Sequence, residues 1–252
     1  KISVKIGDKT LIESISFDIT QGDYLCIVGP NGSGKSTLLK TLIGIMPIHS
    51  GTITIDSQTV SQFSHKQLAQ RVSYVPQTGG SHLTFTVEEF VRMARYSHHH
   101  VFSEWQTHDH DMVENALDIT ECRPFRHRKM STLSGGECQR VMIAAALAQD
   151  TPIMLLDEPT AFLDPHHQVA VHQLISKLNQ QHHKTIIEVT HDINHAAHHA
   201  RHVLALLGGK GLWHGKAEDF LDAARLKLLY QQDFLFVQHP QHNRLIALAD
   251  ES

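Results

Sequence analysis

Short stretches of regularly spaced apolar residues follow one another along this chain and predict alternating strands and helices. Apolar and polar side chains alternate in Ile2–Ile6 and in Ile15–Ile19, as is typical of strands with one buried face. The uninterrupted apolar run Tyr24–Val28 predicts a buried strand. Further strands are expected at Thr52–Ile55, Ser73–Pro76, Ile153–Leu156, Thr185–Val189 and Val203–Leu207, and a terminal hairpin at Phe234–Val237 and Leu245–Leu248.

Helical spacing of apolar residues occurs between these strands. Ser36–Ile43 predicts a helix directly after the first buried strand, and apolar residues from Val171 to Leu178 share one face of another. Strand patterns stop between Phe85 and Ala148, where helices are expected from Thr86, over Asp111–Leu117 and over Gly136–Gln149. We therefore predict an α/β fold, with a mostly parallel sheet covered by helices and an inserted helical region.

Composition and charge narrow the class of protein. The 252 residues suffice for one large domain or two small ones, and 41% hydrophobic content provides for a normal core. No apolar run reaches the roughly 18 residues of a membrane span, so a membrane role would depend on a partner. The net charge of −4 argues against a general nucleic-acid binder. Since Lys1 directly adjoins a strand-like segment, we expect native residues before it.

Cysteine and histidine give weaker signals. Cys26, Cys122 and Cys138 lack the spacing of metal ligands, so free thiols in a reducing compartment are expected. The 22 histidines equal Lys and Arg together, and His195, His198, His199 and His202 recur at helical spacing. This stripe indicates either a metal or pH sensor or compositional drift on a solvated surface, and we favour the latter.

A glycine-containing loop between the first buried strand and its helix points to phosphate binding. It follows the pattern G-x-x-x-x-G-K-[ST] in a strand–loop–helix context. Backbone N–H groups and the start of the helix can surround an anion, Lys35 can reach the β- and γ-phosphates, and the Ser36 hydroxyl can bind Mg²⁺. The loop residues are Gly29, Pro30, Asn31, Gly32, Ser33, Gly34, Lys35, Ser36 and Thr37.

Two carboxylates end the apolar strand at Ile153–Leu156. Asp157 can complete the ligands of Mg²⁺, and Glu158 can polarise an attacking water. Cleaving a γ-phosphate requires both charge neutralisation and water positioning. A capped turn after a buried strand is the alternative, but the phosphate loop upstream favours a nucleoside triphosphatase.

A second glycine-containing helix start gives the chain its family resemblance. Ser134, Gly135, Gly136 and Glu137 open a helix whose N-terminus can bind an anion. Together with Asp157 and Glu158, 20 residues after Glu137, this segment resembles the signature of ABC-type ATPases. The resemblance covers essentially the whole chain. It implies a P-loop NTPase (RecA-like) core with an N-terminal antiparallel β subdomain and an inserted α-helical signature subdomain.

The resemblance also implies roles for residues outside these motifs. Gln77 matches the glutamine loop that contacts Mg²⁺, Asp164 matches the loop that crosses the dimer interface, and His191 matches the switch histidine at the γ-phosphate. Ile6 stands where the family usually has an aromatic residue stacked on adenine, so adenine contact is expected to be weaker. The catalytic residues are then Lys35, Glu158 and His191, with ATP as substrate and Mg²⁺ as cofactor.

The partners implied by the resemblance are a second copy of the chain and a membrane permease. Each ATP would lie between the phosphate loop of one subunit and Ser134–Glu137 of the other. The segment Phe85–His98 is similar to ATPases of importers of iron–siderophore, haem, cobalamin and free metal ions. We expect a cleft between the glutamine loop and Val87–Tyr96 to receive a permease helix, with Val91, Arg92, Met93 and Arg95 lining it. Packing within the helical insertion is the alternative, and for Val91 the two are equally favoured. A substrate-binding protein would act indirectly, and the ATPase would sit at the cytoplasmic face of the membrane.

The sequence leaves alternatives to a metal-chelate importer open. An ATPase of a free zinc or manganese importer is the runner-up, and a soluble ABC ATPase without a transport role is another. A nucleotide-binding scaffold without turnover is disfavoured by Lys35, Asp157, Glu158 and His191. We expect a single ABC ATPase domain over 1–252, with core segments 1–84 and 149–252 and a helical subdomain at 85–148.

Overall fold

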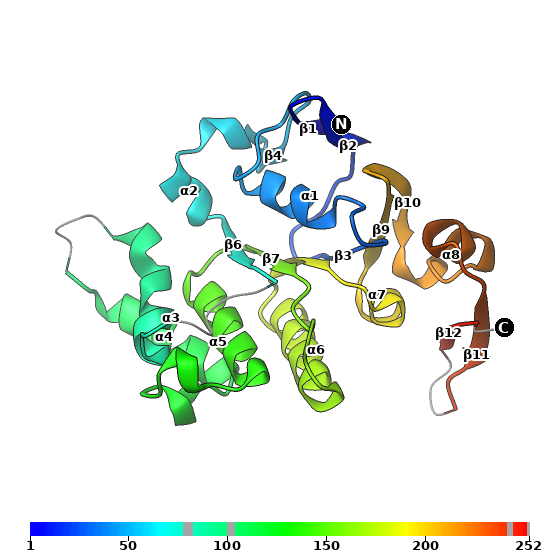
Figure 1. The fold of residues 1–252 in the computed structure, drawn as a ribbon. Helices are drawn as coiled ribbons and strands as arrows, with labels where there is room; N and C mark the ends of the chain where they lie inside the picture. The colour runs from blue at the N-terminus through cyan, green and yellow to red at the C-terminus, as the bar shows by residue number, and fades with distance from the viewer. Residues whose placement is uncertain (78–82, 100–103, 241–243, 251–252) are drawn as a thin grey trace. The chain divides into compact units, whose positions relative to one another are not determined.

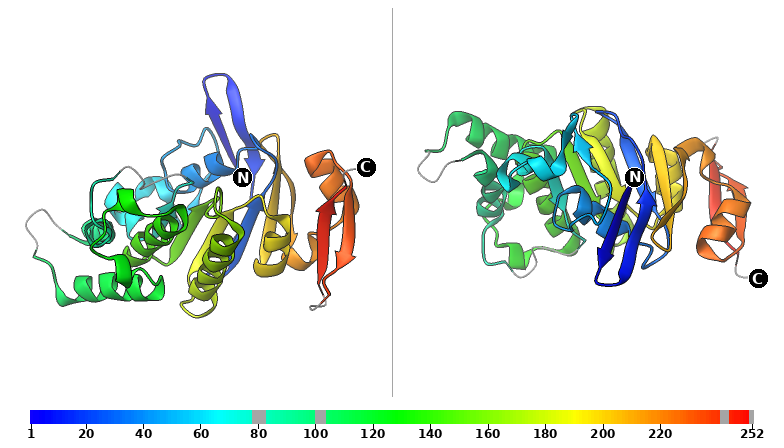
Figure 2. Two further views of the ribbon diagram at one scale, coloured as in Figure 1. Left: turned by 60° about the horizontal axis from the view of Figure 1, so that its bottom comes forward. Right: turned by 90° about the horizontal axis from the view of Figure 1, so that it is seen from above.

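The structure is a computed structural model that describes residues 1–77, 83–99, 104–240 and 244–250 (Figures 1 and 2). The chain divides into two compact units. Unit 1 consists of Lys1–Gln62 and Ile186–Ser252, and unit 2 of Phe63–Thr185. Both combine strands and helices, in agreement with the predicted α/β fold.

Unit 1 contains the buried strands that precede the phosphate loop and His191. Strand β3 pairs in parallel with β8 on one side and with β9 on the other, and β9 pairs with β10 in the antiparallel direction. All five residues of β3 and of β8 are buried, which explains their uninterrupted apolar sequences. These strands are β3 (Tyr24–Val28), β8 (Thr185–Val189), β9 (His202–Leu207) and β10 (Lys210–Lys216).

Hairpins and helices complete unit 1 (Figure 1). Its helices are α1 (Lys35–Leu42), α7 (Ile193–His199) and α8 (Ala223–Tyr230). Its hairpins pair β1 (Ile2–Ile6) with β2 (Lys9–Ile15), β4 (Thr54–Ile55) with β5 (Gln58–Thr59), and β11 (Phe234–Gln238) with β12 (Leu245–Ala249). The Asn194 side-chain amide of α7 donates to the Ala247 carbonyl oxygen at 3.0 Å and accepts from its N–H at 2.9 Å. Helix α7 is therefore joined to the terminal hairpin.

Unit 2 carries the helical region. Strand β6 pairs in parallel with β7, and the helices α3, α4 and α5 pack on one another. Thr86 caps α3 and Ser134 caps α5, each through reciprocal bonds with a glutamate three residues later. The elements are α2 (His65–Ala69), β6 (Val72–Val75), α3 (Val87–Met93), α4 (Thr107–Ile119), α5 (Gly135–Ala148), β7 (Ile153–Asp157) and α6 (Pro165–Gln180).

Several local predictions were wrong or incomplete. The strand expected at Ile15–Ile19 ends at Ile15 and begins at Lys9. The reason is the tight turn at Gly7 and Asp8, which pairs Ile6 with Lys9 and so starts the second strand there; irregularities farther along shift the register until Ile2 pairs with Ile15. The histidine stripe is also interrupted, because α7 ends at His199 and His202 belongs to β9. Helices α2 and α8 and strand β10 were not predicted.

None of the described helices is both long and apolar enough to cross a bilayer.

Candidate functional site

The phosphate loop folds tightly around the ammonium group of Lys35 in unit 1. Lys35 is buried, and its Nζ donates to the carbonyl oxygens of Gly29 at 2.8 Å and Pro30 at 3.1 Å. Gly29 has φ 149°, and a Cβ there would lie 2.2 Å from the Leu206 carbonyl oxygen in β9. Only glycine therefore fits at the exit of β3, as the motif requires.

The start of α1 offers donors to an anion. Its N-cap residue is Gly34, with φ 99°, and no side chain caps the helix. The first turn of a helix has N–H groups without intrahelical partners and carries about half a positive charge. The buried Ser33 hydroxyl also lacks a hydrogen-bond partner among the described residues. These groups fit a phosphate, and the Ser36 hydroxyl, in the first turn of α1, is a hard oxygen donor suited to Mg²⁺.

The carboxylates at the end of β7 are held by side chains from the segment that contains β6. The Tyr74 hydroxyl donates to Asp157 Oδ2 at 3.1 Å, and burial together with the Asp157 charge raises the pKa of Tyr74. Gln77 Nε2 donates to Glu158 Oε2 at 2.6 Å. Glu158 has φ 51°, a left-handed conformation that is uncommon outside glycine and concentrates at functional sites. Within unit 2, the structure thus brings together Gln77, Asp157 and Glu158.

The signature segment opens α5 with a complete capping box. Glu137 N–H donates to the Ser134 hydroxyl at 3.3 Å, and Ser134 N–H donates to Glu137 Oε2 at 2.8 Å. A Cβ at Gly136 would lie 2.1 Å from Cδ2 of His167, whereas Gly135 would meet only Leu163 at 3.6 Å. The close approach of the His167 ring within the same chain is therefore enough to require Gly136, without any partner subunit.

Asp164 begins helix α6. Its Oδ1 accepts from the His167 N–H at 3.0 Å, and its Oδ2 lies 2.6 Å from His167 Nδ1. The hydrogen bonds from His167 lower the pKa of Asp164. Phe162, two residues before Asp164, has φ 63° and is 89% exposed, which is unusual for a large apolar side chain.

His191 and Ile6, the remaining residues with a role implied by the family resemblance, belong to unit 1. His191 is exposed just after β8. Because β3 and β8 are parallel neighbours, the ends that lead to Gly29 and His191 lie at the same edge of the sheet. Ile6, at the end of β1, is 58% exposed, so an aromatic side chain would have room there.

Sequence reasoning missed Tyr74 and His167 as supporting residues. Both sit beside a motif residue only after folding, across strands β6 and β7 for Tyr74 and between helices α5 and α6 for His167. For His167 the sequence did contain a local signal. A histidine three residues after an aspartate at a helix start is placed to meet the carboxylate that caps the helix.

A groove in unit 2 matches part of the surface predicted at Val87–Tyr96. It has a volume of about 620 Å³, and exposed Met93 and Tyr96 lie among its lining residues. The Arg92 guanidinium lies 4.2 Å from the centre of the Trp105 ring and also lines it. Val91 and Arg95 do not: Val91 is fully buried, and Arg95 is paired inside the unit with Asp109 at 2.9 Å. The prediction was therefore wrong for Arg95, and for Val91 the alternative of packing within the helical region holds.

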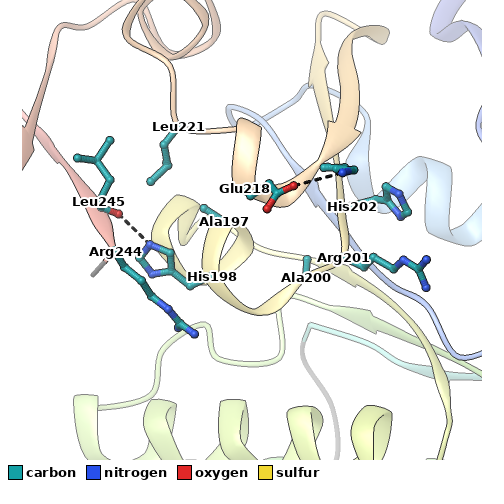
Figure 3. A pocket seen from close by; sticks show the side chains of 10 residues that line it. Ala197, His198, Ala200, Arg201, His202, Glu218, Leu221, Arg244 and Leu245 are labelled. Carbon is teal, nitrogen blue, oxygen red and sulfur yellow. Dashed lines mark hydrogen bonds and ion pairs between the residues drawn. The ribbon is translucent and has the colours of Figure 1, made fainter. Parts of the chain in front are cut away.

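A second pocket, of about 740 Å³, lies in unit 1 (Figure 3). Its lining includes Arg201, His202, Lys216 and Arg244, and His198 Nε2 lies 2.8 Å from the Leu245 carbonyl oxygen. None of the residues of the nucleotide motifs lines it.

The fold and these motifs together define a P-loop NTPase, and comparison with known proteins gives its family. The ABC transporter family model matches residues 12–161, and the chain belongs to this family of ATP-binding, ATP-hydrolysing subunits. The chain is 36% identical over 248 residues to the iron(3+)-hydroxamate import ATP-binding protein FhuC of Bacillus subtilis (strain 168), covering 98% of this chain and 92% of FhuC. It is 35% identical over 240 residues to the ferric enterobactin transport ATP-binding protein FepC of Escherichia coli (strain K12), covering 95% and 89%.

Solved structures agree with this assignment. An inward-facing transporter described as of the metal-chelate type matches with a TM-score of 0.86 at 28% identity, covering 98% of this chain and 94% of that one. A dimeric ATP-binding cassette bound to ADP and phosphate, in a post-hydrolysis state, matches with a TM-score of 0.73 at 28% identity, covering 86% and 96%. The expected fold, a P-loop core with an antiparallel β part and helical signature region, is confirmed.

Proposed function

We propose that the chain is the ATP-hydrolysing subunit that energises a membrane importer of a metal chelate, of the iron–siderophore, haem or cobalamin class. The names of FhuC and FepC, and the metal-chelate type of the matched transporter, support this substrate class. The observation that carries the ATPase assignment is the group at the end of β7, where Gln77 holds Glu158 beside the buried carboxylate of Asp157.

The phosphates of ATP would be bound by the loop Gly29–Thr37. Lys35 would exchange the carbonyl oxygens of Gly29 and Pro30 for the β- and γ-phosphates, because a charged acceptor bonds an ammonium group more strongly. Ser36, Asp157 and Gln77 would hold Mg²⁺, which supplies charge neutralisation when bound. Glu158 would accept a proton from the attacking water, and His191 would hydrogen bond the γ-phosphate.

A second copy of the chain would complete each site. Ser134, Gly135 and Gly136 would contact the ATP bound to the partner, with Asp164 in the loop that crosses the interface. Phe162 supports an interface at this loop, because a phenylalanine that is 89% exposed in the single chain would gain by being covered. The matched cassette bound to ADP and phosphate is itself dimeric.

The groove around Met93 and Tyr96 would receive a helix of the permease. Exposed apolar side chains next to a guanidinium stacked on Trp105 provide both apolar contact and a fixed charge for an incoming helix. The chain would then lie at the cytoplasmic face of the membrane and meet a substrate-binding protein only through the permease. We also propose that 1–252 form one ABC ATPase domain, with a core of 1–84 and 149–252 and a helical subdomain at 85–148.

The variant Glu158→Gln tests the ATPase assignment. An amide of the same shape can still accept a bond from Gln77 but takes no proton from water, so ATP binding should persist while hydrolysis falls roughly 100-fold or more. Nucleotide binding, size in solution with ATP and phosphate release would be measured together. Hydrolysis at the wild-type rate would remove Glu158 from this role.

The substrate class is tested separately in vesicles that contain the chain with its permease. Hydrolysis should rise with a binding protein loaded with a ferric chelate and stay unchanged with free Zn²⁺ or Mn²⁺. Stimulation by the free ions alone would instead assign the chain to a metal-ion importer.

A further inference from the structure

A cluster of potential metal ligands lies inside unit 1, apart from the residues assigned to ATP. It contains Cys26 of β3, Glu188 of β8 and His195 of α7, all of them buried. One donor atom from each residue lies within 4.8 Å of the others. Cys26 and Glu188 are register partners in adjacent parallel strands, so their side chains leave the same face of the sheet. Residues far apart in the sequence thus meet under helix α7.

Glu188 is a buried carboxylate beside an imidazole that is a cation only when protonated. Its side chain is completely buried, and Oε1 has no hydrogen-bond partner among the described residues. Oε2 accepts a hydrogen bond from the Tyr24 hydroxyl and lies 3.5 Å from His195 Nε2. A buried carboxylate with one oxygen left without a partner is costly, and a bound cation removes that cost.

The chemistry of the donors selects the type of cation. A thiolate and an imidazole are soft or borderline ligands and, combined with a carboxylate, suit Zn²⁺ and its neighbours rather than Mg²⁺. Binding of such a cation would displace the thiol proton of Cys26, because cysteine binds these metals as the thiolate.

We propose that Cys26, Glu188 and His195 bind a Zn²⁺-type divalent cation within unit 1. Tyr24 is a positioning residue: its hydroxyl donates to Glu188 and lies 3.0 Å from His195 Nε2. The ring of His195 stacks on His199 with 4.8 Å between ring centres, which holds it in place from the other side.

The cation would join three elements that serve the ATP site. Strand β3 leads to Gly29, strand β8 leads to His191, and α7 begins two residues after His191. A bond from each element to one ion would fix these segments relative to one another. The site itself requires no ATP hydrolysis, so it stands or fails independently of the proposed transport function.

Cobalt substitution tests the site in the full chain. Protein freed of metal by a chelator, in a reductant without thiols, would be titrated with Co²⁺. A thiolate-to-cobalt charge-transfer band in the near ultraviolet should saturate at one ion per chain. Cys26→Ser should abolish the band, whereas Cys122→Ser and Cys138→Ser, which remove the other two buried thiols, should keep it.

Two further variants keep the test decisive if Cys26→Ser fails to fold. Glu188→Gln and His195→Gln should each weaken Co²⁺ binding at least about ten-fold, since even outer-shell partners of a metal matter that much. The matched control His198→Gln, on the same helix, should not. The group Asp164, His166 and His167 contains no thiol and so gives no such band.

The absence of a charge-transfer band in folded wild-type protein would overturn the proposal, as would a band that survives in Cys26→Ser. Unchanged affinity in both Glu188→Gln and His195→Gln would overturn it as well. Glu158→Gln should bind Co²⁺ like the wild type, so a failure of the ATPase assignment remains distinguishable.

Discussion

The phosphate loop and the signature segment each place glycines at the start of a helix, yet a side chain caps only the helix of the signature segment. At α1 the N-cap is Gly34 and no side chain caps the helix, while the Ser33 hydroxyl lacks a partner among the described residues. At α5 the reciprocal bonds of Ser134 and Glu137 cap the helix. The first loop keeps donors available for a ligand, and the second is ordered before any ligand arrives. We infer that binding energy resides mainly in the phosphate loop and that the signature contributes shape.

The largest effect should follow from removing the charge in the phosphate loop. Lys35→Ala should weaken ATP binding by roughly 10- to 150-fold, the equivalent of a lost hydrogen bond to a charged group at about 1.5–3 kcal/mol. Titration with a fluorescent ATP analogue would measure this. The exposed Lys40→Ala in the same helix is the matched control and should bind normally. Normal binding by Lys35→Ala would assign the phosphates elsewhere.

At the signature segment, adding one methyl group should lower the stability of the single chain even before nucleotide or a partner subunit binds. Gly136→Ala should lower stability by about 1–3 kcal/mol, because its Cβ would lie 2.1 Å from the His167 ring. Adding His167→Ala should restore most of the loss, whereas Gly135→Ala, with its open position, should cost little. Urea unfolding of the three variants and the wild type would show this. No rescue by the second substitution would mean that Gly136 serves something other than this contact.

The cap of α5 should contribute a smaller amount. Ser134→Ala should destabilise the chain by about 1 kcal/mol and also weaken ATP-dependent dimerisation. Thr86→Ala removes an equivalent capping box at α3 and should match the loss of stability without changing dimerisation. If both variants dimerise equally well, Ser134 is only a cap.

An effect of similar size, on ATP affinity, is expected beside the phosphate loop. Ile6→Tyr should tighten ATP binding by about 1 kcal/mol, or roughly five-fold, since base–aromatic stacking is worth at least that. Ile6→Leu controls for a change of apolar side chain. GTP affinity measured in parallel would show whether the gain is specific for adenine, and equal or weaker ATP affinity would contradict it.

Sequence was most informative where function and local structure impose the same residues. Gly29 and Lys35 could be placed from the motif because backbone geometry and charge both demand them. Side-chain partnerships across the fold could not be inferred: the bond of Gln77 to Glu158 and the contact of Gly136 with His167 depend on packing between segments.

The same limit explains the errors. Val91 and Arg95 share a helical region with Arg92 and Met93, and only the tertiary packing decides that the first two face inwards. Arg95 is tolerated there because Asp109 neutralises it. Cys26 likewise has no nearby ligand in sequence, since its neighbours Glu188 and His195 come from the other end of the chain.

The two hydrogen bonds between Asn194 and Ala247 limit where the chain can be truncated. The hairpin β11–β12 exposes Leu235, Val237, Leu245 and Leu248, so deleting it would be an obvious way to improve solubility. That truncation would leave the Asn194 amide, which imitates the peptide group of a neighbouring strand, with nothing to pair with at the helix that follows His191. Replacing the four apolar residues while keeping the hairpin backbone is the safer route to a well-behaved protein.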